Sequence, residues 1–301
     1  MYYVLCNPLS ANKQGAVLSQ SLIGKLEREE IKFVDILTLK DYSDFWKTID
    51  LETDNVILSG GDGTLNRFIN ATAGSALPKN LYYFAAGSGN DFKHDVSPDT
   101  DDLIPLHDYI KDLPTVTVKG KKYYFINGIG FGIDGYCCEM GDKLKKKSDK
   151  PVNYTSIAIK GLLFDFTPAN AKVTVDGVTS EYRRVWIAPT MKGKYYGGGM
   201  MVTPAQDRFE PDGTVSVALM YGTGKLKTLM VFPSIFKGEH VKHTEMVKIL
   251  RGHEITVKFD RPTSLQIDGE TVLDVTEYTV SAGCAKKNAA DAEKESVRGK
   301  T

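Results

Sequence analysis

The spacing of hydrophobic and polar positions changes near residue 105, which divides this chain into two differently patterned parts. In the first part, short apolar runs typical of buried strands alternate with segments in which apolar residues recur every three or four positions, as on one face of a helix. The pattern predicts strands at residues 2–6, 31–37, 56–58 and 81–86 and helices at residues 18–29, 42–49 and 65–73. Such regular alternation predicts a parallel sheet with helices on both faces.

The second part is dominated by short runs of alternating hydrophobicity, which predict a mostly antiparallel β domain. Asp-Gly turns separate several of these runs. A hairpin is expected from residues 115–118 and 123–127, which flank the turn at residues 119–122, and further strands are expected at residues 172–175, 184–189, 214–220, 254–259, 264–267 and 278–282. Helical spacing returns at residues 154–166 and 225–236. We therefore expect a nucleotide-binding α/β domain at 1–121, a β domain at 122–284 whose last strand is free to return to the first domain, and a disordered tail at 285–301.

A glycine-rich turn connects the third predicted strand to its helix. Gly60, Gly61 and Gly63 tolerate unusual dihedrals and let another group approach the backbone closely, and Thr64 is placed to cap the helix. A glycine turn that opens onto a helix N-terminus suits phosphate. The turn is neither a Walker loop nor the dinucleotide fingerprint, since it lacks the Gly-Lys-Ser/Thr of the former and the third glycine of the latter. The alternative is an ordinary strand–helix connection without a ligand.

Asp62 places a carboxylate inside this turn. Phosphate would repel it unless a cation bridges the two groups or the carboxylate orients a reacting hydroxyl, so the turn predicts metal-assisted phosphoryl transfer. Other polar turns follow the neighbouring strands, at residues 7–10, at Thr38 and at residues 87–91. Because parallel strands end at one edge of a sheet, we expect all four turns to converge there.

The amino-acid composition excludes only a few classes of function. The 38 basic and 38 acidic residues cancel, so no overall charge argues for a nucleic-acid partner, and none is expected. No run of about twenty apolar residues and no signal-peptide layout is present, which predicts a soluble cytoplasmic protein. The hydrophobic content of 42% is sufficient for two cores.

The segment Gly60-Gly61-Asp62-Gly63-Thr64 resembles the signature shared by diacylglycerol kinases, sphingosine kinases and NAD kinases. Four further segments resemble the diacylglycerol kinase catalytic family and occur in that family's order: residues 7–10, residues 87–92, residues 203–205 with 211–213, and residues 267–270. The chain departs from the family pattern at Ala11, Ala85 and Pro211. The resemblance implies a Rossmann-like N-terminal α/β domain and a C-terminal antiparallel β-sandwich.

The resemblance also implies an activity and its residues. The expected reaction moves the γ-phosphate of ATP, the co-substrate, to the hydroxyl of diacylglycerol with Mg²⁺ as cofactor. Glu270 is expected to be the general base, although Asp-Gly-Glu is also an ordinary hairpin turn. Asp62 is expected to be a second catalytic carboxylate. ATP contacts are expected from Asn7, Ser10, Thr38, Gly60, Gly61, Asp62, Gly63, Thr64, Ser88, Asn90 and Asp91. Asn90 and Asp91 are alternatively turn-formers.

A second magnesium ion is expected at Asp212, with the carbonyl groups of Phe209 and Thr214 as further ligands, since the family binds an ion in this turn. The alternative is a plain Pro-Asp-Gly turn. Residues 239, 240 and 243 offer a Glu and two His, but a solvated face explains their spacing better than a metal does.

The resemblance implies a lipid partner at a membrane surface, hence peripheral association, and leaves a homodimer open. The lysine run at residues 143–150 either contacts anionic headgroups or is simply solvated. Two other functions stay open, an NAD-kinase-like enzyme and a catalytically silent nucleotide- or lipid-binding module. The lipid acceptor itself is not specified by the sequence.

Overall fold

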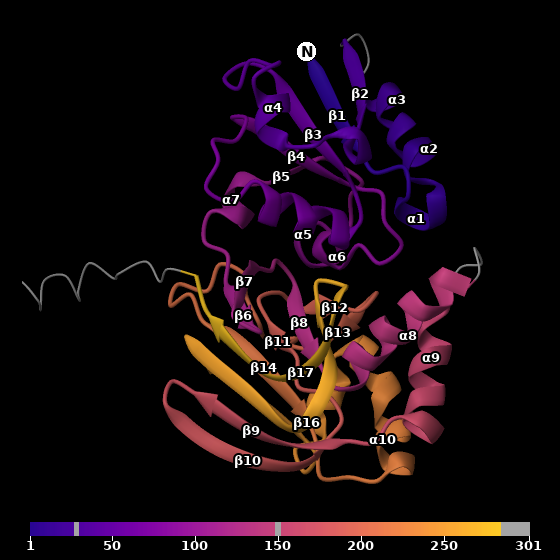
Figure 1. The fold of residues 1–301 in the computed structure, drawn as a ribbon, viewed down its shortest axis with the longest axis vertical. Coiled ribbons are helices and arrows are strands. Elements are labelled where there is room, and N and C mark those ends of the chain that lie inside the picture. The colour runs from indigo at the N-terminus through magenta and orange to yellow at the C-terminus, as the bar shows by residue number, and fades with distance from the viewer. Residues whose placement is uncertain (27–29, 148–151, 284–301) are drawn as a thin grey trace, which may run out of the picture.

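The computed structural model describes residues 1–26, 30–147 and 152–283, so the expected tail lies outside the described residues. Two units follow one another along the chain and lie one above the other in Figure 1, the first in indigo and purple and the second in magenta to yellow. Among the described residues, no helix is both long and apolar enough to span a bilayer.

The first unit is built on a five-stranded sheet in the order β2-β1-β3-β4-β5. Its first four strands are parallel, as predicted: β1 (Tyr2–Cys6), β2 (Ile31–Asp35), β3 (Asn55–Gly60) and β4 (Asn80–Ala85). The edge strand β5 (Ile104–Pro105) is antiparallel. The parallel strands therefore end on the same edge, as the sequence required.

Helices cover both faces of this sheet. They are α1 (Ser10–Lys13), α2 (Gly15–Gln20), α3 (Leu22–Lys25), α4 (Tyr42–Trp46), α5 (Asp62–Ala71), α6 (Asp91–Val96) and α7 (His107–Ile110). Successive side chains of a strand point to opposite faces. Accordingly Leu5 packs in one cluster with Phe68 of α5, whereas Val4 packs in another with Leu22 of α3.

Two predicted elements of the first unit have the wrong bounds. The helix expected at residues 18–29 is broken at Ser21 into α2 and α3, because Leu22 is buried whereas Leu18 is 38% exposed and does not continue a buried stripe. Residues 27–29 lie outside the described residues. The strand expected at 31–37 ends at Asp35, whose carboxylate accepts a hydrogen bond from the N–H of Leu37 and begins the short 3₁₀ helix η1 (Ile36–Thr38).

The second unit contains a ten-stranded sheet whose pairings are all antiparallel. Its strands are β6 (Thr115–Val118), β7 (Lys121–Tyr124), β8 (Gly128–Phe131), β9 (Ala169–Val175), β10 (Val178–Val185), β11 (Thr190–Met191), β14 (Val215–Met220), β15 (Val247–Gly252), β16 (Glu254–Ile267) and β17 (Glu270–Ser281). The strands β12 (Tyr195–Tyr196) and β13 (Met200–Met201) form a separate hairpin. The antiparallel prediction is confirmed.

Long β16 joins the two parts of this sheet. Residues 255–259 pair with β9, and residues 265–267 pair with β8, so the sheet bends around one apolar cluster. The two strands expected at 254–259 and 264–267 are therefore one. Strand β15 and the first half of β17 were missed, since charged residues interrupt their alternation.

The hairpin of β6 and β7 belongs to the second sheet, since β6 pairs with β17. Its turn consists of Lys119 and Gly120 alone, with φ of 48° and 72°, which is the backbone of a tight type I′ turn. The division expected at residue 121 thus falls inside this hairpin, and β17 lies between β16 and β6.

Helices gather on one side of the second sheet (Figure 1). They are α8 (Ile133–Lys147), α9 (Tyr154–Lys160), the π-helical turn η2 (Gly161–Asp165), α10 (Lys225–Val231), and the 3₁₀ helices η3 (Phe232–Lys237) and η4 (Glu239–Lys242). Helix α8 was not predicted. Its buried stripe runs through Ile133, Cys137 and Gly141, of which only the first is large and apolar, so its periodicity is weak.

Candidate functional site

The glycine turn after β3 lies against the turn after β4. A Cβ atom on Gly87 would stand 2.4 Å from the Cα of Gly61, so the two backbones lie too close together for a side chain at Gly87. The expected close approach is therefore present, but it is made by a neighbouring loop. The unusual dihedrals are absent, because neither Gly60, Gly61 nor Gly63 has a left-handed φ.

Thr64 does not cap the helix. Helix α5 begins at Asp62 after Gly61, and no side chain caps it. Thr64 is the third residue of α5, and its hydroxyl oxygen accepts a hydrogen bond of 2.8 Å from the side-chain amide of Asn7. The turns after β1 and β3 are thereby joined through two buried polar side chains.

The carboxylate of Asp62 joins three elements. It accepts hydrogen bonds from the N–H groups of Asp91 (3.0 Å) and Phe92 (2.9 Å), which open α6, and from the side-chain amide of Asn127 (2.9 Å), which precedes β8. The sequence suggested no packing role for Asp62. In the structure Asp62 neutralises part of the positive end of α6 and ties the first unit to the second.

Asp91 is a second acid at the same place, and it is buried, whereas Asp62 is half-buried. The N–H groups of Gly198 and Gly199 donate to its carboxylate at 2.8 and 2.6 Å, and both belong to the tip between β12 and β13. These glycines have φ of 83° and 102°, which only glycine adopts readily. Burial and, after it, the negative charge of Asp62 raise the pKa of Asp91 to about 7.

The remaining residues of the turn after β4 differ in what they contact. Asn90 has a left-handed φ of 54°, and its amide both accepts a hydrogen bond from the N–H of Gly87 and donates one to the Gly87 carbonyl. Asn90 therefore acts as a turn-former in this structure. Ser88 is exposed.

Glu270 lies against the first turn of α5. Its Oε1 atom is 3.2 Å from the position of a Cβ on Gly63, and it forms an ion pair of 2.7 Å with Arg67 of the same helix. Glu270 follows Asp268 and Gly269, whose φ values of 44° and 94° are those of a tight hairpin turn. Asp-Gly-Glu therefore forms a hairpin turn, and this turn also brings Glu270 beside the glycine turn after β3.

Asp268 anchors this hairpin. Its buried carboxylate accepts hydrogen bonds from three consecutive N–H groups, those of residues 126, 127 and 128, and from the amide of Asn66 on α5. Burial raises the pKa of Asp268, although these four donors oppose the rise. The role of Asp268 could not be predicted from the motif at residues 267–270, because one of its partners, Asn66, is 202 residues away in sequence.

The two predicted hydroxyls at residues 10 and 38 differ in their placement. Ser10 donates to the carbonyl of Asn7 at 2.9 Å and so belongs to the turn that Asn7 joins to Thr64. Thr38 donates to the carbonyl of Asp35 at 2.7 Å and is exposed at the end of η1, after the edge strand β2. The convergence of strand-end turns thus holds for those after β1, β3 and β4, which direct contacts connect.

The turn expected to bind a second metal ion is held by hydrogen bonds. Oδ1 of Asp212 accepts from the N–H (2.9 Å) and the hydroxyl (2.8 Å) of Thr214, and the Thr214 carbonyl accepts from Gln206 at 3.1 Å. In the described part of the chain no three His, Cys, Asp or Glu side chains cluster as metal ligands. One carboxylate and two carbonyl oxygens nevertheless suit Mg²⁺, which keeps several waters.

Comparisons with known proteins agree with this architecture. The family model of the diacylglycerol kinase catalytic domain matches residues 1–117, and that of the YegS C-terminal NAD kinase beta sandwich-like domain matches residues 127–282. A diacylglycerol kinase of Mycobacterium tuberculosis (strain CDC 1551 / Oshkosh) is 25% identical over 254 residues, 80% of each chain. The putative lipid kinase YtlR of Bacillus subtilis (strain 168) is 23% identical over 93% of this chain and 96% of its own.

A solved structure shows the same fold. The crystal structure of a putative diacylglycerol kinase from Bacillus anthracis str. Sterne superposes with a TM-score of 0.62 at 16% identity and covers 93% of both chains. The second family model matches more than half of the chain, and the first matches the unit that carries the glycine turns. The chain therefore belongs to the diacylglycerol kinase catalytic-domain family.

Proposed function

We propose that this lipid kinase transfers the γ-phosphate of ATP to a lipid hydroxyl group, and that the acceptor is diacylglycerol, which becomes phosphatidic acid. The observation that carries the proposal is the position of Glu270. A hairpin of the second unit brings this carboxylate against the turn of α5 that holds Asp62, although Glu270 and its partner Arg67 are 203 residues apart in sequence.

The proposed chemistry assigns each group a task. The turns at residues 60–64 and 87–91 receive the ATP phosphates, where the backbone N–H groups that open α5 favour anions. Glu270 accepts the proton of the lipid hydroxyl as its oxygen attacks the γ-phosphorus and the β–γ bridging oxygen leaves with ADP. Because Glu270 contacts Arg67 here, the hydroxyl must compete with that ion pair.

Mg²⁺ belongs to the proposal in two places. One ion enters with ATP and offsets the repulsion between the phosphates and the carboxylates of Asp62 and Asp91. The other is the ion proposed at Asp212 with the carbonyl oxygens of Phe209 and Thr214. Asp212 lies near Arg251 and His253, whose charges help to lower its pKa after the hydrogen bonds from Thr214.

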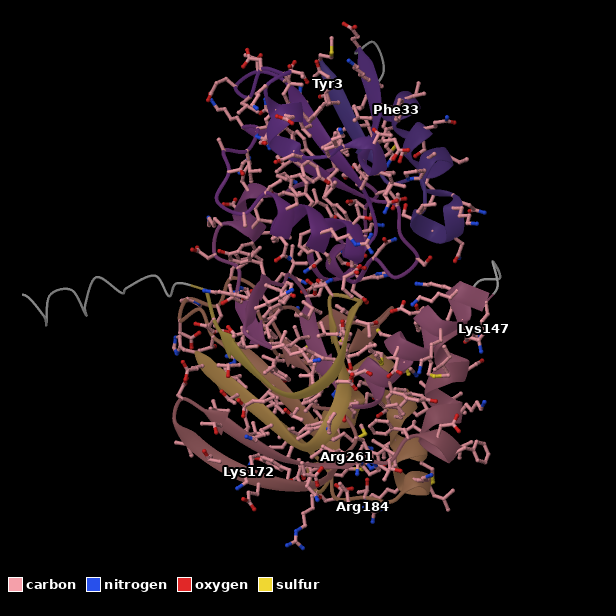
Figure 2. All side chains as sticks on the ribbon, in the orientation of Figure 1. Tyr3, Phe33, Lys147, Lys172, Arg184 and Arg261 are labelled. Carbon is pink, nitrogen blue, oxygen red and sulfur yellow. The ribbon has the colours of Figure 1, made fainter. Side chains whose placement is uncertain are left out.

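The membrane surface is the proposed source of the acceptor. Lys146 and Lys147 are exposed at the end of α8, and Figure 2 shows Lys147 pointing away from the body of the unit. At the other end of α8, where Gly161 of η2 lies against Tyr136, η2 and α10 expose Phe164, Leu226 and Met230 by 72, 74 and 75%. Lysines at one end of this helical layer and exposed apolar side chains at the other support an interfacial surface that meets anionic headgroups. Of the lysine run, Lys150 lies outside the described residues.

The first experiment identifies the acceptor. The purified chain is incubated with Mg²⁺ and γ-labelled ATP and with separate micelles of diacylglycerol, sphingosine, ceramide or phosphatidylglycerol, and with NAD⁺ in solution. We expect labelled phosphatidic acid from diacylglycerol. Label in NAD⁺ alone would replace the proposal with an NAD-kinase-like function, and ATP binding without transfer to any acceptor would indicate a silent module.

The second experiment tests the two acids. Asp62→Asn and Glu270→Gln should each lower kcat about a hundredfold or more. The matched control is Glu277→Gln, which removes an exposed ion pair with Lys258 farther along β17. Near-normal kcat in folded Glu270→Gln, with a raised Kd for ATP, would make Glu270 a nucleotide ligand instead.

The third experiment tests the membrane surface. Neutral substitutions of Lys145, Lys146 and Lys147 should weaken binding to vesicles that contain phosphatidylglycerol, and added salt should do the same. Neutral substitutions of Lys172, Lys248 and Lys258, on strands of the second sheet, change the net charge equally and should not. Equal losses from both triple variants would refute the assignment of this surface.

A further inference from the structure

A buried arginine of the second unit reaches the acid of the phosphate turn through one side chain. The side chains of Arg208 and its ion-pair partner Asp95 are 7 and 4% exposed, and Nε of Arg208 is 2.5 Å from Oδ2 of Asp95 on α6. The other two guanidinium nitrogens donate to the carbonyl of Ile126 at 2.5 Å and to Oδ1 of Asn127 at 2.6 Å. The guanidinium also lies 5.0 Å above the ring of Phe92.

Arg208 determines which way the amide of Asn127 points. A guanidinium only donates hydrogen bonds, so the oxygen of the amide must face Arg208, and the NH₂ group must face the carboxylate of Asp62, to which it donates at 2.9 Å. In the flipped orientation, the amide oxygen would face a carboxylate and the NH₂ group would face a guanidinium. Both contacts would be repulsive.

The backbone of Asn127 has hydrogen bonds of its own. Its N–H donates to Asp268 at 2.9 Å, and its carbonyl accepts from the N–H groups of Lys192 and Gly193 at 2.9 and 3.1 Å. Arg208 contacts the preceding peptide group through the Ile126 carbonyl alone, so loss of Arg208 acts chiefly on the side chain of Asn127. Asp95 also accepts from the N–H of Lys194 at 3.1 Å, so loss of Arg208 leaves Asp95 one partner.

We propose that Arg208 is a positioning residue for phosphoryl transfer, which acts on Asp62 through the amide of Asn127. The proposal rests on the proposed lipid kinase function, in which Asp62 lies beside the reacting phosphate. Since Arg208 and Asn127 belong to the second unit and Asp62 and Asp95 to the first, the same contacts couple the placement of the acid to the docking of the two units.

The activity test compares Arg208→Met and Arg208→Lys with Arg261→Met. Arg261 is the control, because it also belongs to the second unit and donates to a backbone carbonyl, that of Thr167 at 2.5 Å, and Figure 2 shows it near the end of that unit farther from the first unit. Arg208→Met should lower kcat about tenfold or more with the KM for ATP within about twofold, and Arg261→Met should change neither. Arg208→Lys keeps the charge and should recover part of the loss.

A double-mutant cycle separates positioning from folding. In an Asn127→Ala background, Arg208→Met should have almost no further effect on kcat, because the group it orients is gone. An equal loss of kcat in both backgrounds would overturn the proposal and leave Arg208 a structural residue.

A readout without catalysis keeps the proposal distinguishable from the function on which it rests. The side-chain amide protons of Asn127, identified in ¹H–¹⁵N spectra by their absence in Asn127→Ala, should exchange with water at least about tenfold faster in Arg208→Met and at the wild-type rate in Arg261→Met. Equal exchange in all three proteins would refute the orienting contact. Normal protection in a wild-type chain that phosphorylates no lipid would refute the proposed function alone.

Discussion

Replacing Gly87 with Ala should disrupt the contact between the two glycine turns. The new Cβ would stand 2.4 Å from the Cα of Gly61 and 2.7 Å from Oδ1 of Asn90. Because ordinary contact begins near 3.4 Å, the backbones must separate by about 1 Å. Overpacking of this kind costs about 1–3 kcal/mol of stability, and a 1 Å displacement in an active site lowers the rate by up to about a hundredfold.

Gly89→Ala is the matched control, because it adds the same methyl group to the same loop. Its Cβ would meet the Cα of Gly198 at 3.4 Å and a carboxylate oxygen of Asp62 at 3.6 Å, which are ordinary contacts. Urea titrations should show a lower free energy of unfolding for Gly87→Ala and one within about 0.5 kcal/mol of the wild type for Gly89→Ala. Equal free energies of unfolding for the two variants would refute the steric argument, whatever the activities.

Two further predictions concern single carboxylates, and a third concerns the arginine paired with Glu270. Asp134 is buried, and burial raises its pKa from the ordinary value of 3.8 to about 6. Between these pH values the folded protein keeps a proton that the unfolded chain has lost, so the free energy of unfolding falls as the pH rises from 4 to 6, by about 3 kcal/mol in all. Asp134→Asn should therefore raise the free energy of unfolding by an amount of this order at pH 8 and leave it unchanged at pH 4, and the same effect at both pH values would exclude the titration. Asp212→Ala should lose activity at saturating Mg²⁺·ATP with little change in ATP affinity, and full activity would argue for the plain turn. Arg67→Met should raise kcat or lower the lipid KM if the ion pair with Glu270 competes with the hydroxyl, whereas a loss of kcat would show that Arg67 aids transfer.

The sequence predicted the parts of the fold that depend on local pattern. Strands β1 and β3 are apolar runs buried after their first residue, and β4 is an apolar run buried at Leu81 and Tyr83, so both their type and their parallel order could be predicted. Helix α8 could not, because a glycine and a cysteine occupy positions of its buried stripe. The single strand β16 was divided in two, because the charged pair at residues 260–261 interrupts its alternation.

The candidate site was predicted in its residues more than in its contacts. Asp62 and Glu270 were expected as site residues from the family resemblance, but their common position beside one turn of α5 was not predicted, and Asn127, Arg208 and Asp268 were not identified as site residues. Each lies in a loop or turn, and each is defined by a partner far away in sequence, such as Asp95, which is 113 residues from Arg208. The spacing of hydrophobic and polar residues, which reflects local structure, cannot predict a contact between residues so far apart in sequence. A strand-end asparagine at 127, like that at position 7, was the one available signal.

The long sequence separation across the site also sets an order of events during synthesis. Ribosomes add about 5–20 residues per second, so the 203 residues from Arg67 to Glu270 take about 10–40 s to make. Within that interval the first sheet can form, and Asp62 can accept hydrogen bonds from the N–H groups of Asp91 and Phe92. The amide of Asn127, which also donates to Asp62, and the glycine N–H groups that donate to Asp91 are made only later. In a nascent chain both acids therefore lack their partners from the second unit, and the complete site appears only when the last hairpin closes.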